Sequence, residues 1–155
     1  MRFITTLLLL ALVCACALPQ PRSHQPLPTV ATYAASKEAV WTAVMSEIAV
    51  NYRVQTLDRE SGFLGIETTH IPIGPGRPMT DWVFMPDVLF GTWEALSLTM
   101  NILVEEQSAD FTKVTVRTGY HALETRIYRA WIPCETNGQL EQMVLMAIDD
   151  RLREK

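Results

Sequence analysis

The stretch "ALSLTMNILVEE", residues 95–106, decides the fold because its side chains alternate between apolar and polar along its length. Its apolar side carries Leu96, Leu98, Met100, Ile102 and Val104. Its polar side carries Ser97, Thr99 and Asn101. A period of two predicts a β-strand with one face buried and the other face in water. The sequence therefore predicts a sheet that is covered on one side.

The following stretch, "FTKVTVRTGYHA" at residues 111–122, repeats this alternation after a polar turn at 107–110. Its expected inward side chains are Val114, Val116 and Tyr120, and its expected outward side chains are Lys113, Thr115 and Arg117. Two alternating stretches joined by a short polar turn are typical of a β-hairpin. A second hairpin is predicted over residues 52–69, where Asp58 to Gly62 supply the turn residues. A short strand is expected at residues 127–132.

Helical periodicity appears on both sides of the strands. Residues 36–51 begin with Ser36, a suitable N-cap, and carry an apolar stripe made of Val40, Trp41, Val44, Met45 and Ile48. Near the C-terminus, Thr136 and Gln139 have the spacing of a capping box. The stripe that follows them is Leu140, Met143, Val144, Ala147, Ile148 and Leu152. We therefore expect an α+β fold, a two-layer sandwich with an antiparallel sheet of four to five strands and N- and C-terminal helices packed on one face.

The first residues have the pattern of a secretory signal peptide: a positive charge, a short apolar run and small residues at its end. The run is too short to span a bilayer comfortably. Its end resembles the lipobox of bacterial lipoproteins, with Val13 three residues before Cys16 and Ala15 directly before it. The resemblance implies cleavage before Cys16 and lipidation of Cys16 by acyl chains such as palmitate. Plain cleavage after Ala15 or Ala17 is the alternative.

The lipobox resemblance also implies a location. Ala17 follows the lipidated cysteine in place of the Asp that favours inner-membrane retention in enterobacterial lipoproteins, so we expect an outer-membrane lipoprotein on the periplasmic side. The expected organisation is a signal peptide at 1–15, a Pro-rich spacer at 16–35 and a single α+β domain at 36–155. Removing the signal leaves about 140 residues, which is enough for one core.

Charge and cysteine content restrict the possible functions. The formal net charge is −4, so the chain lacks the basic character of a nucleic-acid-binding protein, and we expect no nucleic-acid partner. If Cys16 is lipidated and Cys14 is removed with the signal, Cys134 is left without an intramolecular disulfide partner. We expect it to behave as a small buried side chain.

The segment that runs from Val40-Trp41 through Tyr52-Arg53-Val54 to the turn Asp58-Arg59-Glu60-Ser61-Gly62 resembles the repeating unit of BamC-like lipoproteins of the outer-membrane assembly machinery. The resemblance covers residues 36–69 and, more loosely, the later hairpin and the final helix. It implies a helix-grip fold and suggests a place in an envelope complex. This chain has room for one such unit where BamC has two.

The sequence shows no pattern of a catalytic site. His121 and Glu124 would lie on opposite faces of a strand, and His70 has no obvious partner. The segment "IGPGRP" lacks the Lys-Ser/Thr continuation of a phosphate-binding loop. We therefore expect a non-enzymatic protein with no catalytic residues, no metal ligands and no cofactor.

Residues 70–94 form the most informative segment because they join the two hairpins with many prolines, glycines and aromatic residues. Long loops of this kind are often functional. The predicted partner-binding residues are Arg77, Trp82, Phe84, Phe90 and Trp93. The alternative is that the aromatic side chains fold back over the sheet as a lid or as an extra strand at "DWVF", residues 81–84.

Two functions follow from these patterns. The first is a structural or accessory subunit of an outer-membrane-associated assembly or secretion machine, held at the membrane by its lipid anchor and bound to a protein partner. The second is a periplasmic binding module that grips a small apolar ligand or a lipid.

Overall fold

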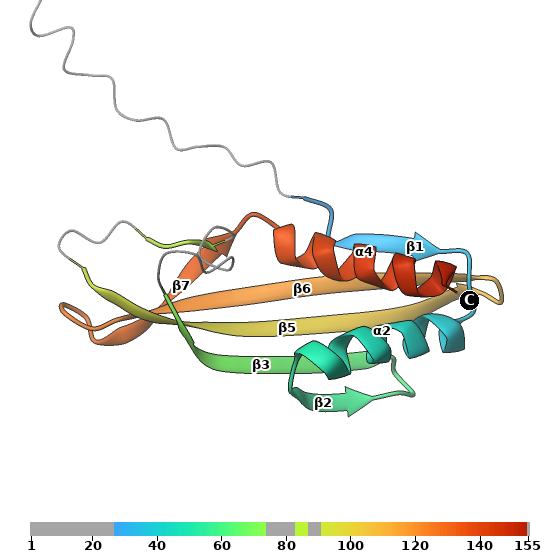
Figure 1. The fold of residues 1–155 in the computed structure, drawn as a ribbon, viewed down its shortest axis with the longest axis horizontal. Helices are drawn as coiled ribbons and strands as arrows, with labels where there is room; N and C mark the ends of the chain where they lie inside the picture. Colours follow the sequence, from blue (N-terminus) through green and yellow to red (C-terminus); the bar gives the residue numbers. More distant parts are fainter. Residues whose placement is uncertain (1–26, 74–82, 87–90, 155) are drawn as a thin grey trace, which may run out of the picture.

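The computed structural model describes residues 27–73, 83–86 and 91–154, so the signal peptide, Cys16 and most of the Pro-rich spacer lie outside the described residues. The described part forms an elongated molecule with a long sheet and two helices (Figure 1). The elements in chain order are β1 (Val30–Tyr33), α2 (Lys37–Asn51), β2 (Val54–Asp58), β3 (Phe63–Pro72), β4 (Val83–Phe84), β5 (Trp93–Ser108), β6 (Phe111–Glu124), β7 (Ala130–Thr136) and α4 (Gln139–Arg153).

The sheet is antiparallel and has seven strands in the order β2-β3-β5-β6-β7-β4, with β1 paired to β6 beside this path. The expectation of an antiparallel sheet with N- and C-terminal helices is confirmed, but the expected count of four to five strands is wrong. The additional strands are short. β1 has four residues and β4 has two, so neither carries enough alternation to predict a strand with certainty, although an extra strand at residues 81–84 was the alternative stated above for β4.

Strand β1 lies within residues 16–35, which the proline content predicted to be a spacer. It pairs with residues 112–115 of β6, and β7 pairs with residues 120–124 of the same strand. Tyr33 is buried and its hydroxyl donates a hydrogen bond to the carbonyl oxygen of Leu145 in α4, at 2.7 Å. The packed domain therefore begins before residue 36.

The core lies between the helices and one face of the sheet, as the alternation predicts. The inward side chains of β5 and β6 that the sequence identified are all buried, namely Leu96, Leu98, Met100, Ile102, Val104, Val114, Val116 and Tyr120. They form one cluster with the buried side chains of both helices. Both helices therefore pack on the same face of the sheet.

Helix α2 follows the sequence pattern closely. Ser36 accepts a hydrogen bond from the backbone N–H of Ala39 at 3.4 Å and caps the helix. Trp41 is 6% exposed, and the stripe that contains it faces the core. The hairpin that follows turns at Gly62, where φ is +75° and a Cβ atom would lie 2.1 Å from the Val104 carbonyl oxygen. Only glycine fits this turn.

Helix α4 begins later than the sequence suggested. Its N-cap is Gly138, while Thr136 accepts a hydrogen bond from the Gly138 N–H and Asn137 accepts one from the Gln139 N–H. The predicted capping box between Thr136 and Gln139 is therefore wrong. The stripe is also rotated from the predicted one, because Met143 is 48% exposed and Leu145 is buried.

Candidate interaction site at the β6–β7 turn

The end of the sheet that carries the β6–β7 turn projects beyond both helices (Figure 1). The turn follows Glu124, whose side chain is fully buried. One carboxylate oxygen, Oε1, accepts hydrogen bonds from the backbone N–H groups of Thr92 and Arg126 at 3.0 and 2.8 Å. The other, Oε2, accepts from the N–H groups of Ile127 and Tyr128 at 2.8 and 2.6 Å. The Glu124 side chain thus holds the turn, and together with the Thr125 N–H, which donates to the Thr92 carbonyl oxygen at 3.0 Å, it ties the turn to the start of β5.

The environment of Glu124 favours its charged form. Burial raises the pKa of this carboxyl group, but the four backbone N–H groups that point at it outweigh this and lower the pKa to about 2. Converging N–H groups form an anion-binding concavity of the kind that usually holds a phosphate. Here the chain's own carboxylate occupies it, so the site serves to shape the turn.

The fixed turn presents apolar and cationic side chains to solvent. Ile127 is 49% exposed, Tyr128 is 62% exposed and Trp131 is 37% exposed, and Arg126 and Arg129 are exposed between them. Arg129 has a φ of +50°, so the left-handed region reverses the chain before β7 begins. Neither arginine forms a salt bridge with any residue that the structure describes. We call residues 126–131 the turn site.

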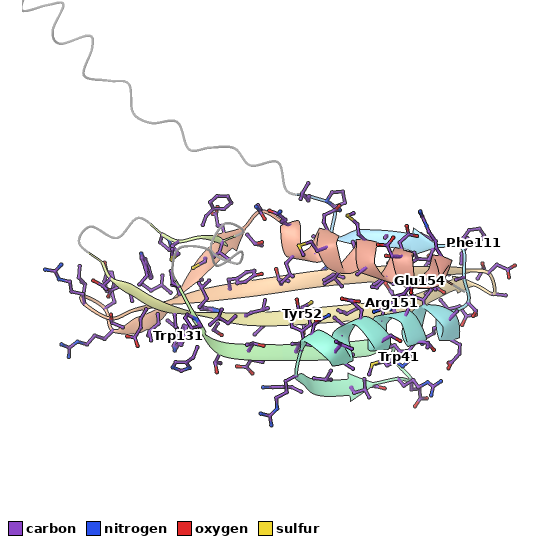
Figure 2. The ribbon with its side chains drawn as sticks, in the orientation of Figure 1. Trp41, Tyr52, Phe111, Trp131, Arg151 and Glu154 are labelled. Atoms are coloured by element: carbon purple, nitrogen blue, oxygen red, sulfur yellow. The ribbon has the colours of Figure 1, made fainter. Side chains whose placement is uncertain are left out.

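Trp131 connects the turn site to the end of β3. Its ring lies edge-to-face against the ring of His70, with centroids 5.6 Å apart and an interplanar angle of 88°. His70 has a φ of +58° and lies in the irregular part of β3, between residues 68 and 71, where the pairing with β5 shifts register. Figure 2 shows Trp131 at the end of the molecule opposite Phe111. This contact between the two rings supports the position of Trp131 on the surface.

The structure describes two of the five predicted partner-binding residues. Trp93 lies opposite Glu124 in the β5–β6 register and is partly buried against the core. Phe84 is partly buried in β4 and lies opposite Glu135 of β7. Arg77, Trp82 and Phe90 are outside the described residues. The part of "DWVF" that is described therefore forms an extra strand, and Trp93 packs against the core.

Sequence reasoning missed the turn site because residues 127–132 were expected to form a strand. The strand begins at Ala130, so Ile127 and Tyr128 belong to the turn. The physical reason is that the Glu124 carboxylate takes the N–H groups of residues 126–128, which are then unavailable to a ladder. The composition of "RIYRAW", residues 126–131, was the available signal, since Arg, Tyr and Trp are the residues most common at binding hot spots.

The described residues hold no group of three or more His, Cys, Asp and Glu side chains that could bind a metal ion. No helix in the described part of the chain is long and apolar enough to cross a membrane. His121 and Glu124 do not converge, because Glu124 is turned inward and holds the turn while His121 lies on the opposite face of β6. In comparisons with known proteins, no family model matches the chain and no curated protein matches it.

Proposed function

We propose that this protein is a non-enzymatic lipoprotein, anchored to the outer membrane through Cys16, that serves as an accessory subunit of an envelope assembly or secretion machine. In this proposal it binds its protein partner through the turn site. The observation that carries the proposal is the exposed set of Ile127, Tyr128 and Trp131 on a backbone held by the buried carboxylate of Glu124.

The fixed geometry of the turn lowers the entropic cost of binding a partner. A flexible loop loses conformational entropy when it binds, and this loss weakens the complex. In the turn site the backbone N–H groups of residues 126–128 are already held in one arrangement, so this cost is reduced. Tyrosine and tryptophan also have few side-chain rotamers, which limits the cost of ordering them.

The turn site indicates the character of the partner surface. Its centre is apolar and aromatic, and Arg126 and Arg129 add positive charge to a chain whose net charge is −4. A matching surface has an apolar pocket for Tyr128 or Trp131 with carboxylate groups around its rim. The arginines in this position contribute mainly to the rate of association and to the choice of partner.

The resemblance to BamC-like lipoproteins supports the same proposal. Two helices pack on one face of an antiparallel sheet, which is the arrangement that a helix-grip unit requires. Fold alone does not define a partner, whereas the exposed side chains of the turn site offer a partner specific contacts.

Photo-crosslinking in cells tests the proposal. A photoreactive phenylalanine analogue at position 128 is expected to capture one defined envelope protein, while the same analogue at position 111 captures none. Position 111 is a matched control because Phe111 is also an exposed aromatic, at the other end of β6. Equal labelling from both positions, or labelling of lipid alone from position 128, contradicts a protein partner at the turn site.

The anchor has a separate test. Cys16→Ala is expected to move the protein from the membrane fraction to the soluble periplasmic fraction, since acyl chains supply the membrane affinity. Cys14→Ala is the control and is expected to leave the protein in the membrane fraction. If Cys14→Ala alone releases the protein, the assignment of Cys16 is wrong.

A further inference from the structure

The strands β1 and β2 lie along opposite margins of the sheet (Figure 1). Among the described strands β2 pairs only with β3, and this pairing shifts register between Val54 and Thr56, so the edge is irregular. The strand also follows the exposed Arg53 and ends at the exposed Asp58. Irregular pairing and charged side chains keep the edge of a sheet from pairing with other chains. The β2 edge is therefore protected.

The β1 edge has neither of these features. Among the described strands β1 pairs only with β6, from Val30 with Thr115 to Tyr33 with Thr112, and the register does not shift. Its sequence, VATY, contains no charged residue. Val30 is 46% exposed, and Thr32 is exposed as well. The outer edge of β1 is thus regular and uncharged, which is the kind of edge that another strand extends.

The register shows which backbone groups of β1 are free. The Val116 N–H donates to the carbonyl oxygen of Thr29 at 2.9 Å, so these two residues form a hydrogen-bonded pair. Because such pairs alternate along an antiparallel ladder, the backbone groups of Ala31 also face β6, and those of Val30 and Thr32 face away from it. Val30 and Thr32 therefore each present an N–H and a carbonyl oxygen without a partner in the described part of the chain.

A groove of about 300 Å³ lies beside this edge, between β1 and α4. Its lining residues on α4 are Gln142, Leu145, Met146 and Asp149. The Gln142 amide donates to the Pro28 carbonyl oxygen at 2.7 Å, and the Tyr33 hydroxyl donates to the Leu145 carbonyl oxygen, so β1 runs alongside α4. Met146 is 63% exposed. The free edge thus has a large exposed apolar side chain next to it.

We propose that two copies of this chain pair through β1 across a twofold axis, which joins their sheets into one continuous sheet. The pairing is antiparallel and centred on Ala31, so that Val30 of each copy lies opposite Thr32 of the other copy. Each such pair exchanges two hydrogen bonds, and the free N–H and carbonyl groups of both residues are then all satisfied.

The symmetry of the edge favours a second copy as the occupant. The free groups of Val30 and Thr32 are placed evenly about Ala31, and a small side chain suits the axis because the Cα atoms of a non-hydrogen-bonded pair are about 4.5 Å apart. Ala31 packs against the core on the helix side, so Met146 of each copy covers the alanine pair there. Asp149, also in the groove, already forms a salt bridge with Arg153 at 2.5 Å, which limits repulsion between the copies.

The pairing is independent of the turn site and of the anchor. β1 pairs with residues 112–115, whereas the turn site follows residue 124 at the other end of β6. A dimer formed through β1 therefore leaves the turn site of each copy exposed to its own partner.

Cysteine crosslinking tests the axis. Cells that produce the full chain with Ala31→Cys are oxidised with copper phenanthroline, and the covalent dimer is measured on a non-reducing gel. The Ala31→Cys variant is expected to form the dimer, because a Cα separation of about 4.5 Å lies in the range of a disulfide. The chain without this substitution measures any crosslinking of the native cysteines.

Val30→Cys is the matched control for the register. Positions 30 of the two copies are diagonal neighbours, about 7–8 Å apart, which is beyond the reach of a disulfide. Val30→Cys is therefore expected to give at least about tenfold less dimer than Ala31→Cys, although Val30 is the more exposed of the two. Equal yields indicate random collision and overturn the proposal, as does an absence of dimer from Ala31→Cys. Capture of a different protein by Ala31→Cys also overturns it, because the edge then pairs with a partner's strand.

Two further variants, each added to Ala31→Cys, test the contacts. Thr32→Pro removes an N–H that faces away from β6, so it is expected to abolish the dimer and to leave the unfolding midpoint unchanged. Met146→Lys brings two like charges together near the axis and is expected to lower the yield. Met143→Lys is its control, because Met143 is also exposed but lines the groove between α2 and α4. A dimer that persists in folded Thr32→Pro contradicts the pairing, and if that variant does not fold, equal yields from the two lysine variants contradict it.

Discussion

The two ends of strand β6 both carry exposed aromatic side chains, but they differ in what surrounds them. At the first end, Phe111 is 50% exposed beside a short turn, and the next residue, Thr112, is buried and donates its hydroxyl to the Ala35 carbonyl at 2.8 Å. At the second end, the buried Glu124 shapes a turn that carries Tyr128 outward. Figure 2 labels Phe111 and Trp131 at these opposite ends.

The difference shows what makes an exposed aromatic residue a candidate for binding. The buried polar side chain at the first end ties the sheet to the chain before α2, so it closes the core. The one at the second end fixes a projecting turn where two arginines accompany three large apolar side chains. Single exposed apolar residues are normal on protein surfaces, whereas a fixed cluster with arginine is characteristic of an interface.

The two ends also differ in the part of the molecule that covers them. Helices α2 and α4 lie over the part of the sheet nearer Phe111, and the turn site projects beyond them (Figure 1). Stability and partner binding should therefore be separable by mutation.

The largest effect is expected in the helix-covered part. Trp41→Ala removes a side chain that is 6% exposed in the core, and it should lower the free energy of unfolding by about 3–5 kcal/mol. Chemical denaturation measures the loss. Val50→Ala on the same helix is the control, because Val50 is 79% exposed and its truncation should have little effect. A similar loss in both variants contradicts the assignment of Trp41 to the core.

A smaller effect, on binding alone, is expected at the turn site. Tyr128→Ala should leave the unfolding midpoint unchanged and weaken partner binding by about 2 kcal/mol, or about thirtyfold, because truncating an aromatic hot spot removes its contact in the partner's pocket. The measurement is a titration with the partner captured by crosslinking. Phe111→Ala should leave both quantities unchanged, and equal affinities for the two variants would remove the distinction between the ends of β6.

The smallest effect is a local response to pH. The pKa of Glu124 is lowered from 4.5 to about 2, so its stabilising effect is complete above the ordinary value and is lost as the pH falls through about 2. The amide NMR signals of residues 126–128 should stay constant from neutral pH to about pH 4.5 and then move together with a midpoint near 2. A midpoint near the ordinary value indicates that the carboxylate is free of the turn, which is then flexible.

Local sequence patterns predicted the two long central strands, β5 and β6, and the helix start and the turn that precede them in the chain. The alternation in residues 95–106 and 111–122 predicted which side chains of β5 and β6 are buried, and Ser36 and Gly62 marked a helix start and a turn that the structure contains. Each of these features depends on residues close together in the sequence. A period of two, a capping hydroxyl and a left-handed glycine act within a few residues.

The features that were missed depend on distant partners. β1 is a strand because residues 112–115 of β6 lie beside it, and Tyr33 is buried because Leu145 of α4 accepts its hydroxyl hydrogen. Leu145 is buried and Met143 exposed because the rotation of α4 is set by its packing on the sheet and on α2. These contacts join residues that are far apart in the sequence, so a local sequence pattern cannot predict them.

The sequence by itself determined the strands and helices that carry the core, because burial on one face imposes a period that the residues must follow. Only the tertiary structure decided the candidate site at the β6–β7 turn. Glu124 could be expected at the end of a strand, but the convergence of four N–H groups on it arises from the folding of the turn and the arrival of Thr92 from β5's start. Glu141 accepts a hydrogen bond from Thr118 because α4 packs on β6. Such sites require groups from separate elements in one place, and only packing brings them together.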